Sequence, residues 1–375
     1  MTIALLALAV LWAWLTAREL LASVALPELP PLRERAPVAE VTIVLAVRDD
    51  AAHVEDTVRG LLAQRHVTLR LVVVDDRSSD GTGDVLARLA AGEPRLTIRT
   101  VHELPPDWLG KSHALQLGAA DATTRWLLFT DADTHLADDT LARAIDAAER
   151  ANAQHVSLLP GHRGTTFAGR VCLLAFHLTV LRRVAAVNGR RQRGFVGTGA
   201  FNLVRTDAYR AVGGHLPLRL EVVDDVWLGC LLWRAGHRSR VWLAARDFAV
   251  DWGATPRALV RVVEKNMFAV LRYRTLVAVA ALLLGVAVLL GPIAAPFVAP
   301  LGWLPCACWL SSGLAGAAFA HRMGWGAFAG LLTPLSRLWL VVALANSLAV
   351  TLRRRGVRWR GTFYPLALLR RGQVH

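Results

Sequence analysis

The stretch from Thr275 to Ala320 constrains this chain most, because it contains no Asp, Glu, Lys, Arg or His. A single helix of that length would reach roughly 70 Å at 1.5 Å per residue, which is far longer than a soluble domain. Long uncharged stretches of this kind are typical of helices that cross a membrane. The prolines in its middle are expected to divide it into two spans, at about 276–298 and 301–320.

A third span is expected at about 327–350, although Arg337 near its middle costs roughly 2.5–3.5 kcal/mol on insertion scales. Residues 275–351 therefore predict two to four membrane helices. Three spans would place the arginine-rich C-terminal residues outside, against the positive-inside rule, whereas two or four would place them inside. An interfacial position for residues 327–337 would remove this conflict.

Residues 1–26 predict an N-terminal transmembrane helix, since their apolar run has about the length of a bilayer span. The first residues lack the basic region of a cleaved signal peptide. Positive charge follows the run at Arg18, Arg33 and Arg35. This distribution predicts an integral protein of a bacterial-type cell membrane, with the domain after the linker 27–40 facing the cytoplasm.

The charge balance of 43 Lys and Arg against 29 Asp and Glu gives a net charge of +14. Much of this excess lies in a predicted basic tail, residues 352–375, directly after the apolar region. No basic stripe is interleaved with aromatic residues that could stack on bases. The pattern favours anionic lipid headgroups and argues against a nucleic-acid partner.

Residues 41–255 predict a single α/β domain with a mostly parallel sheet, because apolar strands alternate with helical patterns. The strands are expected at 41–47, 69–74, 96–101 and 126–130, and the helices at 49–64, 84–91, 112–120 and 141–151. Residues 171–181 predict either a core helix or one at the membrane interface. Residues 256–274 predict an amphipathic helix that lies along a membrane surface.

Two aspartates, Asp131 and Asp133, directly follow the buried strand 126–130. In open α/β sheets, ligands bind beyond the carboxyl ends of the strands. Carboxylates this close repel each other unless a cation lies beside them, and Mg²⁺ or Mn²⁺ would take such oxygen ligands together with a phosphate. A solvated pair of loop acids is the alternative.

Further acids follow the same pattern. Asp75 and Asp76 end the second strand on the same sheet edge, although they could simply form a turn in which Asp80 caps the next helix. Asp224 and Asp225 open an apolar helical pattern, where the helix dipole alone would also favour them. Among 43 basic residues the only lysines are Lys111 and Lys265. Two explanations are open. Lysine is kept where a guanidinium would not serve, or the two lysines remain by chance.

Taken together, these segments resemble the membrane-bound branch of family 2 glycosyltransferases, whose catalytic domain has the GT-A fold. The similarity covers Val41 to about Arg274, and five segments in order support it. They are Val-Asp75-Asp76-Arg-Ser-Ser-Asp80-Gly, Trp108-Leu-Gly110-Lys111-Ser-His-Ala114, Thr130-Asp131-Ala-Asp133, Gly197-Thr198-Gly199-Ala200-Phe continuing to Gly213-Gly214-His215, and Asp224-Asp225-Val-x-Leu-Gly.

The resemblance implies metal-dependent, inverting transfer of a sugar from a nucleoside diphosphate sugar to a hydroxyl of a membrane lipid. It implies that Asp225, with Asp224, is the general base and that Asp131 and Asp133 bind Mg²⁺ or Mn²⁺. The implied donor-binding residues are Asp49, Asp75, Asp76, Lys111 and Asp131. The implied acceptor-side residues are Gly197, Thr198, Gly199, His215, Lys265 and Asn266.

The sequence also departs from the family pattern. Arg48-Asp49-Asp50 replaces the usual Asn-Glu, Asp224 replaces Glu, and the Q-x-x-R-W motif of polymerising members is absent. These departures favour transfer of one or few sugars over polysaccharide synthesis, which remains the alternative. A protein that binds nucleotide sugars without turnover, a sugar nucleotidyltransferase and a transporter are less favoured alternatives.

Overall fold

A computed structural model describes residues 1–33 and 39–374, which form two compact units. Residues 34–38 of the predicted linker, Arg35 among them, lie outside the described residues. The helical unit comprises residues 1–26, 163–185 and 252–357, and the sheet unit comprises residues 27–162, 186–251 and 358–375. The units do not follow the predicted boundaries, because residues 163–185 join the helical unit and residues 358–375 join the sheet unit.

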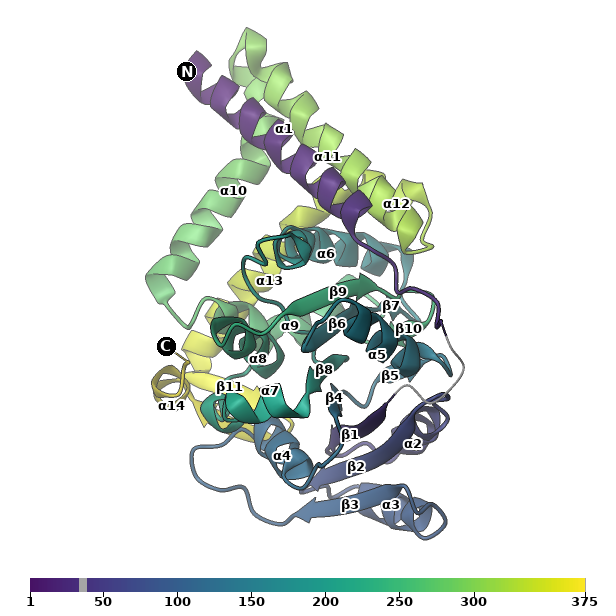
Figure 1. Ribbon diagram of the computed structural model, residues 1–375. Helices are drawn as coiled ribbons and strands as arrows, with labels where there is room; N and C mark the ends of the chain where they lie inside the picture. The colour runs from purple at the N-terminus through teal and green to yellow at the C-terminus, as the bar shows by residue number, and fades with distance from the viewer. Residues whose placement is uncertain (34–38, 375) are drawn as a thin grey trace. The chain divides into compact units, whose positions relative to one another are not determined.

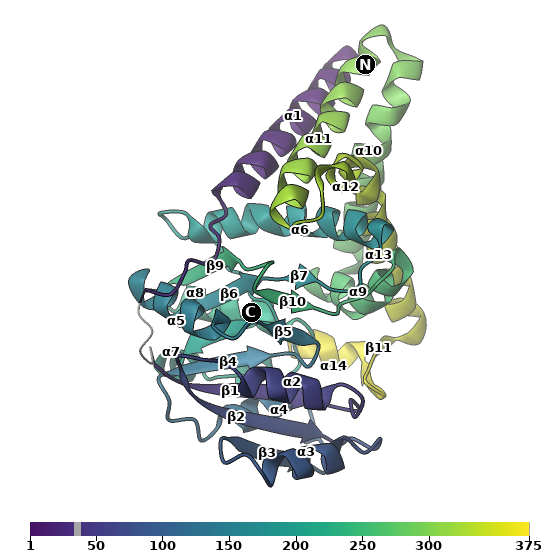
Figure 2. The same cartoon turned by 90° about the vertical axis from the view of Figure 1, so that its right-hand side faces the viewer.

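The sheet unit is built on a seven-stranded, mostly parallel sheet in the order β3-β2-β1-β4-β8-β6-β9, and only β8 runs antiparallel to its neighbours. Figures 1 and 2 show this sheet from two sides. Its strands are β1 (Glu40–Val47), β2 (Thr68–Asp76), β3 (Leu96–Val101), β4 (Trp126–Thr130), β6 (His155–Leu159), β8 (Asn202–Arg205) and β9 (Ser239–Leu243). The predicted α/β class and the first four strands are confirmed.

Helices pack on both faces of the sheet (Figure 2). In Figure 1, α2 and α3 lie on one face of the first strands and α4 on the other. The helices of the sheet unit are α2 (Val54–Leu62), α3 (Thr82–Ala90), α4 (Gly110–Ala119), α5 (Thr140–Arg150), α7 (Thr206–Ala211) and α8 (Asp224–Arg234). A second small sheet contains β5 (Thr134–Leu136), β10 (Phe248–Val250) and β7 (Gly161–His162).

Several local predictions need correction. The helix predicted from residue 49 begins only at Val54, and the left-handed φ of 51° at Asp49 excludes that residue from an α-helix. The N-cap of α3 is Gly81 rather than Asp80, although the Asp80 carboxylate still accepts a bond from the Thr82 amide at 3.0 Å. The helix predicted at 171–181 is longer, since α6 spans Phe167–Asn188.

The helical unit contains α1 (Thr2–Ala25), most of α6, α9 (Pro256–Val270), α10 (Thr275–Val298), α11 (Trp303–Arg322), α12 (Ala327–Leu331) and α13 (Thr333–Arg354). α1 and α11 pack side by side (Figure 1). Among residues 1–33 and 39–374, five helices are long and apolar enough to cross a membrane: α1, α6, α10, α11 with its first turn, and α13. Arg337 of α13 is buried and bonded to the fully buried Glu19 of α1, with Nη2 and Oε2 2.5 Å apart.

The predicted basic tail is folded. It forms the strand pair β11 (Gly356–Trp359) and β12 (Thr362–Pro365), followed by α14 (Leu366–Arg371). Residues 358–375 belong to the sheet unit, where Leu369 is fully buried and Val374 joins the core around β4 and α8. Apolar contacts therefore hold this segment on the sheet unit, which the arginine content alone did not suggest.

Candidate functional site

The carboxylates Asp75 and Asp76 lie at the carboxyl end of β2, as predicted, and both are buried. Asp75 Oδ1 accepts a hydrogen bond from the Ser78 amide at 3.1 Å. Asp76 forms a bidentate pair with Arg77, whose Nε and Nη2 lie 2.8 and 3.1 Å from its two oxygens. These bonds fix the orientation of both carboxylates in the acidic turn.

Asp49 joins the loop after β1 to the loop after β2. Its Oδ1 accepts from the Ser79 amide at 2.8 Å, and its own amide donates to Ser78 Oγ at 2.9 Å. Because β1 and β2 are parallel neighbours, both loops leave the same edge of the sheet. The structure therefore brings Asp49, Asp75 and Asp76 to one edge.

Gly110 and Lys111 open α4 and connect the acidic turn to the end of β4. A Cβ atom on Gly110 would lie only 2.1 Å from Asp76 Oδ2, so only glycine lets the helix start this close to the carboxylate. The next residue, Lys111, donates from Nζ to Asp131 Oδ1 at 2.6 Å. Burial opposes the charge of Lys111, but Asp131, Asp224 and Asp225 together raise its pKa, so it stays cationic.

Asp131 and Asp133 follow β4 in the turn that leads to β5. Thr134 Oγ1 donates to the Asp131 carbonyl at 2.9 Å and fixes this turn. Burial and the neighbouring charge of Asp131 raise the pKa of Asp133 to about 7, while Lys111 and Arg360 oppose this shift. The nearby cations therefore do not fully offset the burial of Asp133 and its repulsion by Asp131.

Asp225 reaches the same place from α8. A Cβ atom on Gly199 would lie 2.9 Å from Asp131 Oδ2, 3.2 Å from Lys111 Nζ and 3.5 Å from Asp225 Oδ2. One glycine thus lies beside three functional groups that come from three separate elements. Burial and the charge of Asp224 raise the pKa of Asp225 to about 6, which suits a general base near neutral pH.

Gly197 also lies against α8, and a Cβ atom there would lie 1.9 Å from the Asp225 carbonyl oxygen. Thr198 Oγ1 donates to the Phe201 carbonyl at 2.8 Å and stabilises the turn before β8. The segment Gly197–Gly199 therefore packs directly on the start of α8. Its glycines allow Asp225 and Asp131 to approach each other.

His215 has a different environment from the one expected of an acceptor-side residue. It is buried, its Nε2 lies 3.7 Å from Asp224 Oδ2, and its Nδ1 lies 2.8 Å from the Tyr209 hydroxyl. The His215 amide donates to Gln116 Oε1 at 2.7 Å. His215 therefore lies beside Asp224, and its assignment to the acceptor side stays a prediction.

Lys265 and Asn266 lie on α9 of the helical unit, where Lys265 Nζ donates to Asn266 Oδ1 at 3.1 Å. They are not members of the sheet-unit cluster around Gly199. Their assignment to the acceptor side stays a prediction.

Sequence reasoning missed four residues that support the site: Arg77, Gln116, Tyr209 and Tyr364. Arg77 was detectable as the basic neighbour of an acid pair. Tyr364 was not, because its hydroxyl accepts from the Gly110 amide at 3.1 Å across 254 positions of the chain. Only the folded C-terminal segment brings these two residues together.

The oxygen atoms of Asp131 and Asp133 fit a hard divalent cation. Across residues 1–33 and 39–374, no group of three or more His, Cys, Asp or Glu side chains is placed to hold a metal. Phosphate and water oxygens would therefore have to complete the coordination of an ion bound here.

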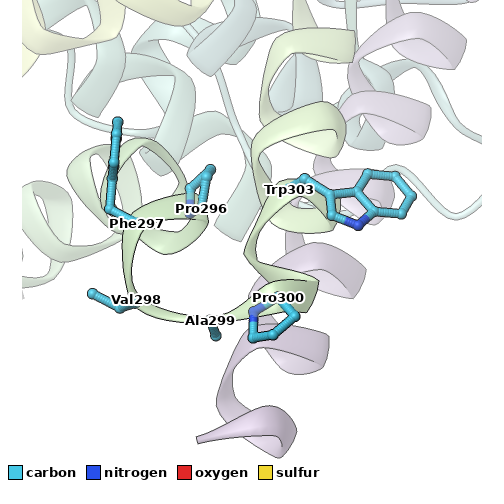
Figure 3. Close-up of a pocket in the computed structure, with 6 residues that line it drawn as sticks. All are labelled: Pro296, Phe297, Val298, Ala299, Pro300 and Trp303. Atoms are coloured by element: carbon cyan, nitrogen blue, oxygen red, sulfur yellow. The ribbon is translucent and has the colours of Figure 1, made fainter.

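A hollow in the helical unit has a different chemistry. It lies at the turn between α10 and α11 and is lined by Pro296, Phe297, Val298, Ala299, Pro300 and Trp303 (Figure 3). Its lining side chains include no ionisable group. This hollow cannot provide the charges that the cluster around Gly199 provides, so we assign the candidate active site to the cluster.

Comparison with known proteins agrees with this geometry. The chain is 33% identical over 125 residues to the succinoglycan biosynthesis protein ExoO of Rhizobium meliloti, which covers 33% of this chain and 34% of that protein. It is 26% identical over 113 residues to the 4,4'-diaponeurosporenoate glycosyltransferase of Staphylococcus haemolyticus, covering 30% of this chain and 29% of that protein. The matched segments thus span about a third of the length of these relatives.

A solved structure resembles almost the whole chain. It is the mannosyltransferase PcManGT from Pyrobaculum calidifontis in complex with GDP-Man and Mn²⁺, with a TM-score of 0.53 and 20% identity over 93% of this chain and 96% of that one. This likeness supports the GT-A fold of the sheet unit. Residues 42–213 match the family described as "Glycosyl transferase family 2". Residues 42–213 thus match glycosyl transferase family 2, within a sheet unit that has the GT-A fold and in a chain that also contains candidate membrane-spanning helices.

Proposed function

We propose that this protein is an inverting glycosyltransferase that moves a sugar from a nucleoside diphosphate sugar to a hydroxyl group of a membrane lipid. The observation that supports this proposal most is the position of Gly199 beside Asp131, Lys111 and Asp225. It combines a candidate metal ligand, a fixed cation and a carboxylate of raised pKa. A general base can activate the acceptor hydroxyl, and positive charge can stabilise a departing diphosphate.

Each residue of the cluster then has a chemical task. Asp75 and Asp76 accept hydrogen bonds from the base or ribose of the donor, and Asp49 holds the two loops around it. Asp131 and Asp133 would hold Mg²⁺ or Mn²⁺, which when bound neutralises charge on the departing diphosphate. Lys111 adds a positive charge at the same place.

Asp225 takes the proton of the acceptor hydroxyl while that oxygen attacks the anomeric carbon. The bond from this carbon to the diphosphate breaks on the opposite face, so the configuration inverts. The charge of Asp224 keeps the pKa of Asp225 high enough for useful basicity. His215 lies beside Asp224, with Nε2 3.7 Å from its Oδ2.

A membrane lipid is proposed as the acceptor because a family 2 domain and long apolar helices share one chain. The carotenoid-type name of the Staphylococcus relative agrees with this choice, whereas the succinoglycan relative keeps polysaccharide synthesis as a second candidate. Product size separates the two. Membranes that contain the protein are incubated with radiolabelled nucleoside diphosphate sugars, and the label is followed into lipid extracts and into polymer.

For lipid transfer we expect a product heavier than its acceptor by one sugar, lost in Asp225→Asn and after chelation, and restored by Mg²⁺ or Mn²⁺. Label that appears only in long polymer would refute a lipid product. Bound donor with no product at all would support a binding protein without turnover.

We further propose that α1, α10 and α11 cross the membrane and that α6 and α13 do not. Residues 27–162, 186–251 and 358–375 form one compact unit, so they lie on one side of the membrane. Between residues 162 and 186 the chain leaves the sheet unit and returns to it, and this segment contains only α6. If α6 crossed the membrane, residues 27–162 and 186–251 would lie on opposite sides. The segment 252–357 likewise begins and ends at the sheet unit, so it must cross the membrane an even number of times.

Packing within the helical unit indicates which helix stays on the near side. α13 lies along α9, with Trp339 Nε1 bonded to the Pro256 carbonyl at 3.0 Å and Ser347 Oγ accepting from the Phe268 amide at 3.0 Å. α9 has 15 residues, too few to span a bilayer. This arrangement leaves α10 and α11 as the crossing pair and removes the conflict that three C-terminal spans created.

Cysteine labelling in intact cells tests this topology in a cysteine-free variant. Leu301→Cys, at the turn between α10 and α11, should react with a membrane-impermeant maleimide from outside. His321→Cys, at the end of α11, should react only after the cells are opened. Reaction of both positions from outside would contradict the proposed spans.

A further inference from the structure

The strand pair β11–β12 lies on the end of β1, next to the predicted donor loops. Arg48 follows β1, and its Nη1 donates to Thr362 Oγ1 at 2.9 Å. In return, Arg360 Nη1 donates to the Arg48 carbonyl at 2.6 Å. These bonds fix the turn of the pair beside Asp49, whose carboxylate lies 3.6 Å from Arg48 Nε.

The turn itself has a strict backbone requirement. Arg360 and Gly361 have φ angles of 43° and 77°, so both central residues of this two-residue turn are left-handed. Tight turns of this kind match the twist of paired strands and favour glycine. Arg360 is a bulky, non-glycine residue with a positive φ, a conformation that such residues rarely adopt. We take this as an indication that its side chain has a function there.

Arg360 lies at the same sheet edge as the candidate metal turn. β1 and β4 are parallel neighbours in which Leu45 lies opposite Thr130, so Arg48 leaves the sheet on the same edge as Asp131 and Asp133, and Arg360 binds the Arg48 carbonyl there. An arginine has five donor hydrogens, so the bond to the Arg48 carbonyl leaves capacity for phosphate oxygens. Lys111, which is bonded to Asp131, and Arg360 come from distant parts of the sequence and lie at the same edge of the sheet.

The second strand of the pair supports the nucleotide side. Tyr364 is buried, and its hydroxyl accepts from the Gly110 amide at 3.1 Å. The same hydroxyl interacts with Arg77, the partner of Asp76. Further along, the Val374 amide donates to Glu221 Oε1 at 2.7 Å and anchors the segment.

We propose that β11–β12 completes the donor site and that Arg360 contacts the diphosphate of the bound nucleotide sugar, while Tyr364 positions the acidic turn. This inference rests on the proposed function. The phosphates of the donor have to lie next to Asp131 and Asp133, and Arg360 brings a guanidinium, a group suited to phosphate, to the same edge of the sheet.

The test compares the affinity of the full-length protein in detergent for GDP and UDP with its affinity for GMP and UMP, by calorimetry with Mg²⁺. Arg360→Gln should weaken binding of the preferred diphosphate by about tenfold or more, as expected for the loss of a charged contact. Binding of the corresponding monophosphate should change much less. Arg358→Gln, an exposed neighbour on the same strand pair, is the matched control and should bind both as the parent does.

Arg360→Lys should retain part of the diphosphate preference, because it keeps the charge. Equal losses of monophosphate and diphosphate binding in Arg360→Gln would indicate a purely structural role and overturn the proposal, as would parental diphosphate binding. Failure of the parent protein to bind any of the nucleotides would instead refute the proposed function. The two failures are therefore distinguishable.

Discussion

The general-base role of Asp225 makes a quantitative prediction about pH. With a pKa raised to about 6 by burial and by Asp224, Asp225 is about nine-tenths ionised at pH 7 and about one-tenth ionised at pH 5. Only the ionised form accepts a proton, so kcat/KM should fall about tenfold for each pH unit below 6. Asp225→Asn should lose this acidic limb together with 10²–10⁴-fold in turnover, about 3–5 kcal/mol of transition-state stabilisation.

Asp224→Asn provides the discriminating variant, because it removes a charge that raises the pKa of Asp225 while the base itself stays. The sign follows directly: with less negative charge nearby, the pKa of Asp225 falls, and the acidic limb should move to lower pH.

Initial rates of transfer from a radiolabelled donor, measured from pH 4.5 to pH 8 at saturating Mg²⁺, give these profiles. Donor binding measured by calorimetry should be retained in both variants. The reasoning fails if Asp225→Asn keeps the parental profile, or if Asp224→Asn moves the limb to higher pH.

Two further predictions concern packing. Gly110→Ala should weaken nucleotide binding about tenfold or more, because its Cβ would lie 2.1 Å from Asp76 Oδ2. The control is Gly60→Ala in α2, where nothing lies within 4 Å of the added Cβ. This variant should bind nucleotide as the parent does in the same calorimetric assay. Parental affinity in Gly110→Ala would contradict the role of Asp76. Glu19→Gln should destabilise the helical unit by about 3–5 kcal/mol, since it leaves Arg337 buried beside a neutral group. Thermal unfolding in detergent measures this, and replacement of both residues by leucine should restore most of the loss; an unchanged midpoint in Glu19→Gln would show that the pair is not stabilising.

Much of the sheet unit could be predicted because local patterns decide it. The run Trp126–Thr130 is apolar and fully buried in β4, and Asp131 and Asp133 follow it where a strand must end. The helix that begins at Asp224 was likewise visible, since acids favour a helix start. Short-range periodicity is enough for such elements, and the chemistry at their ends can be read with them.

Membrane spans were only partly predictable, because hydropathy measures how apolar a helix is and not what it packs against. Arg337 looked like a charge inside a span, yet the fold pairs it with Glu19, more than 300 positions away. α6 is apolar enough to cross, but its chain returns to the unit that it left. The pairing of Arg337 and the position of α6 depend on where distant segments of the chain pack, and local sequence patterns do not contain that information.

The amino-acid sequence alone determined the alternating sheet, the acid pairs at strand ends and the presence of long apolar helices, because each depends on neighbours within a few positions. Tertiary structure alone decided that Gly199 lies between Lys111, Asp131 and Asp225, and that β11–β12 folds back onto β1. The physical reason is that such contacts join side chains from distant segments. Their distances are set by the packing of the whole unit and not by the propensity of any one segment.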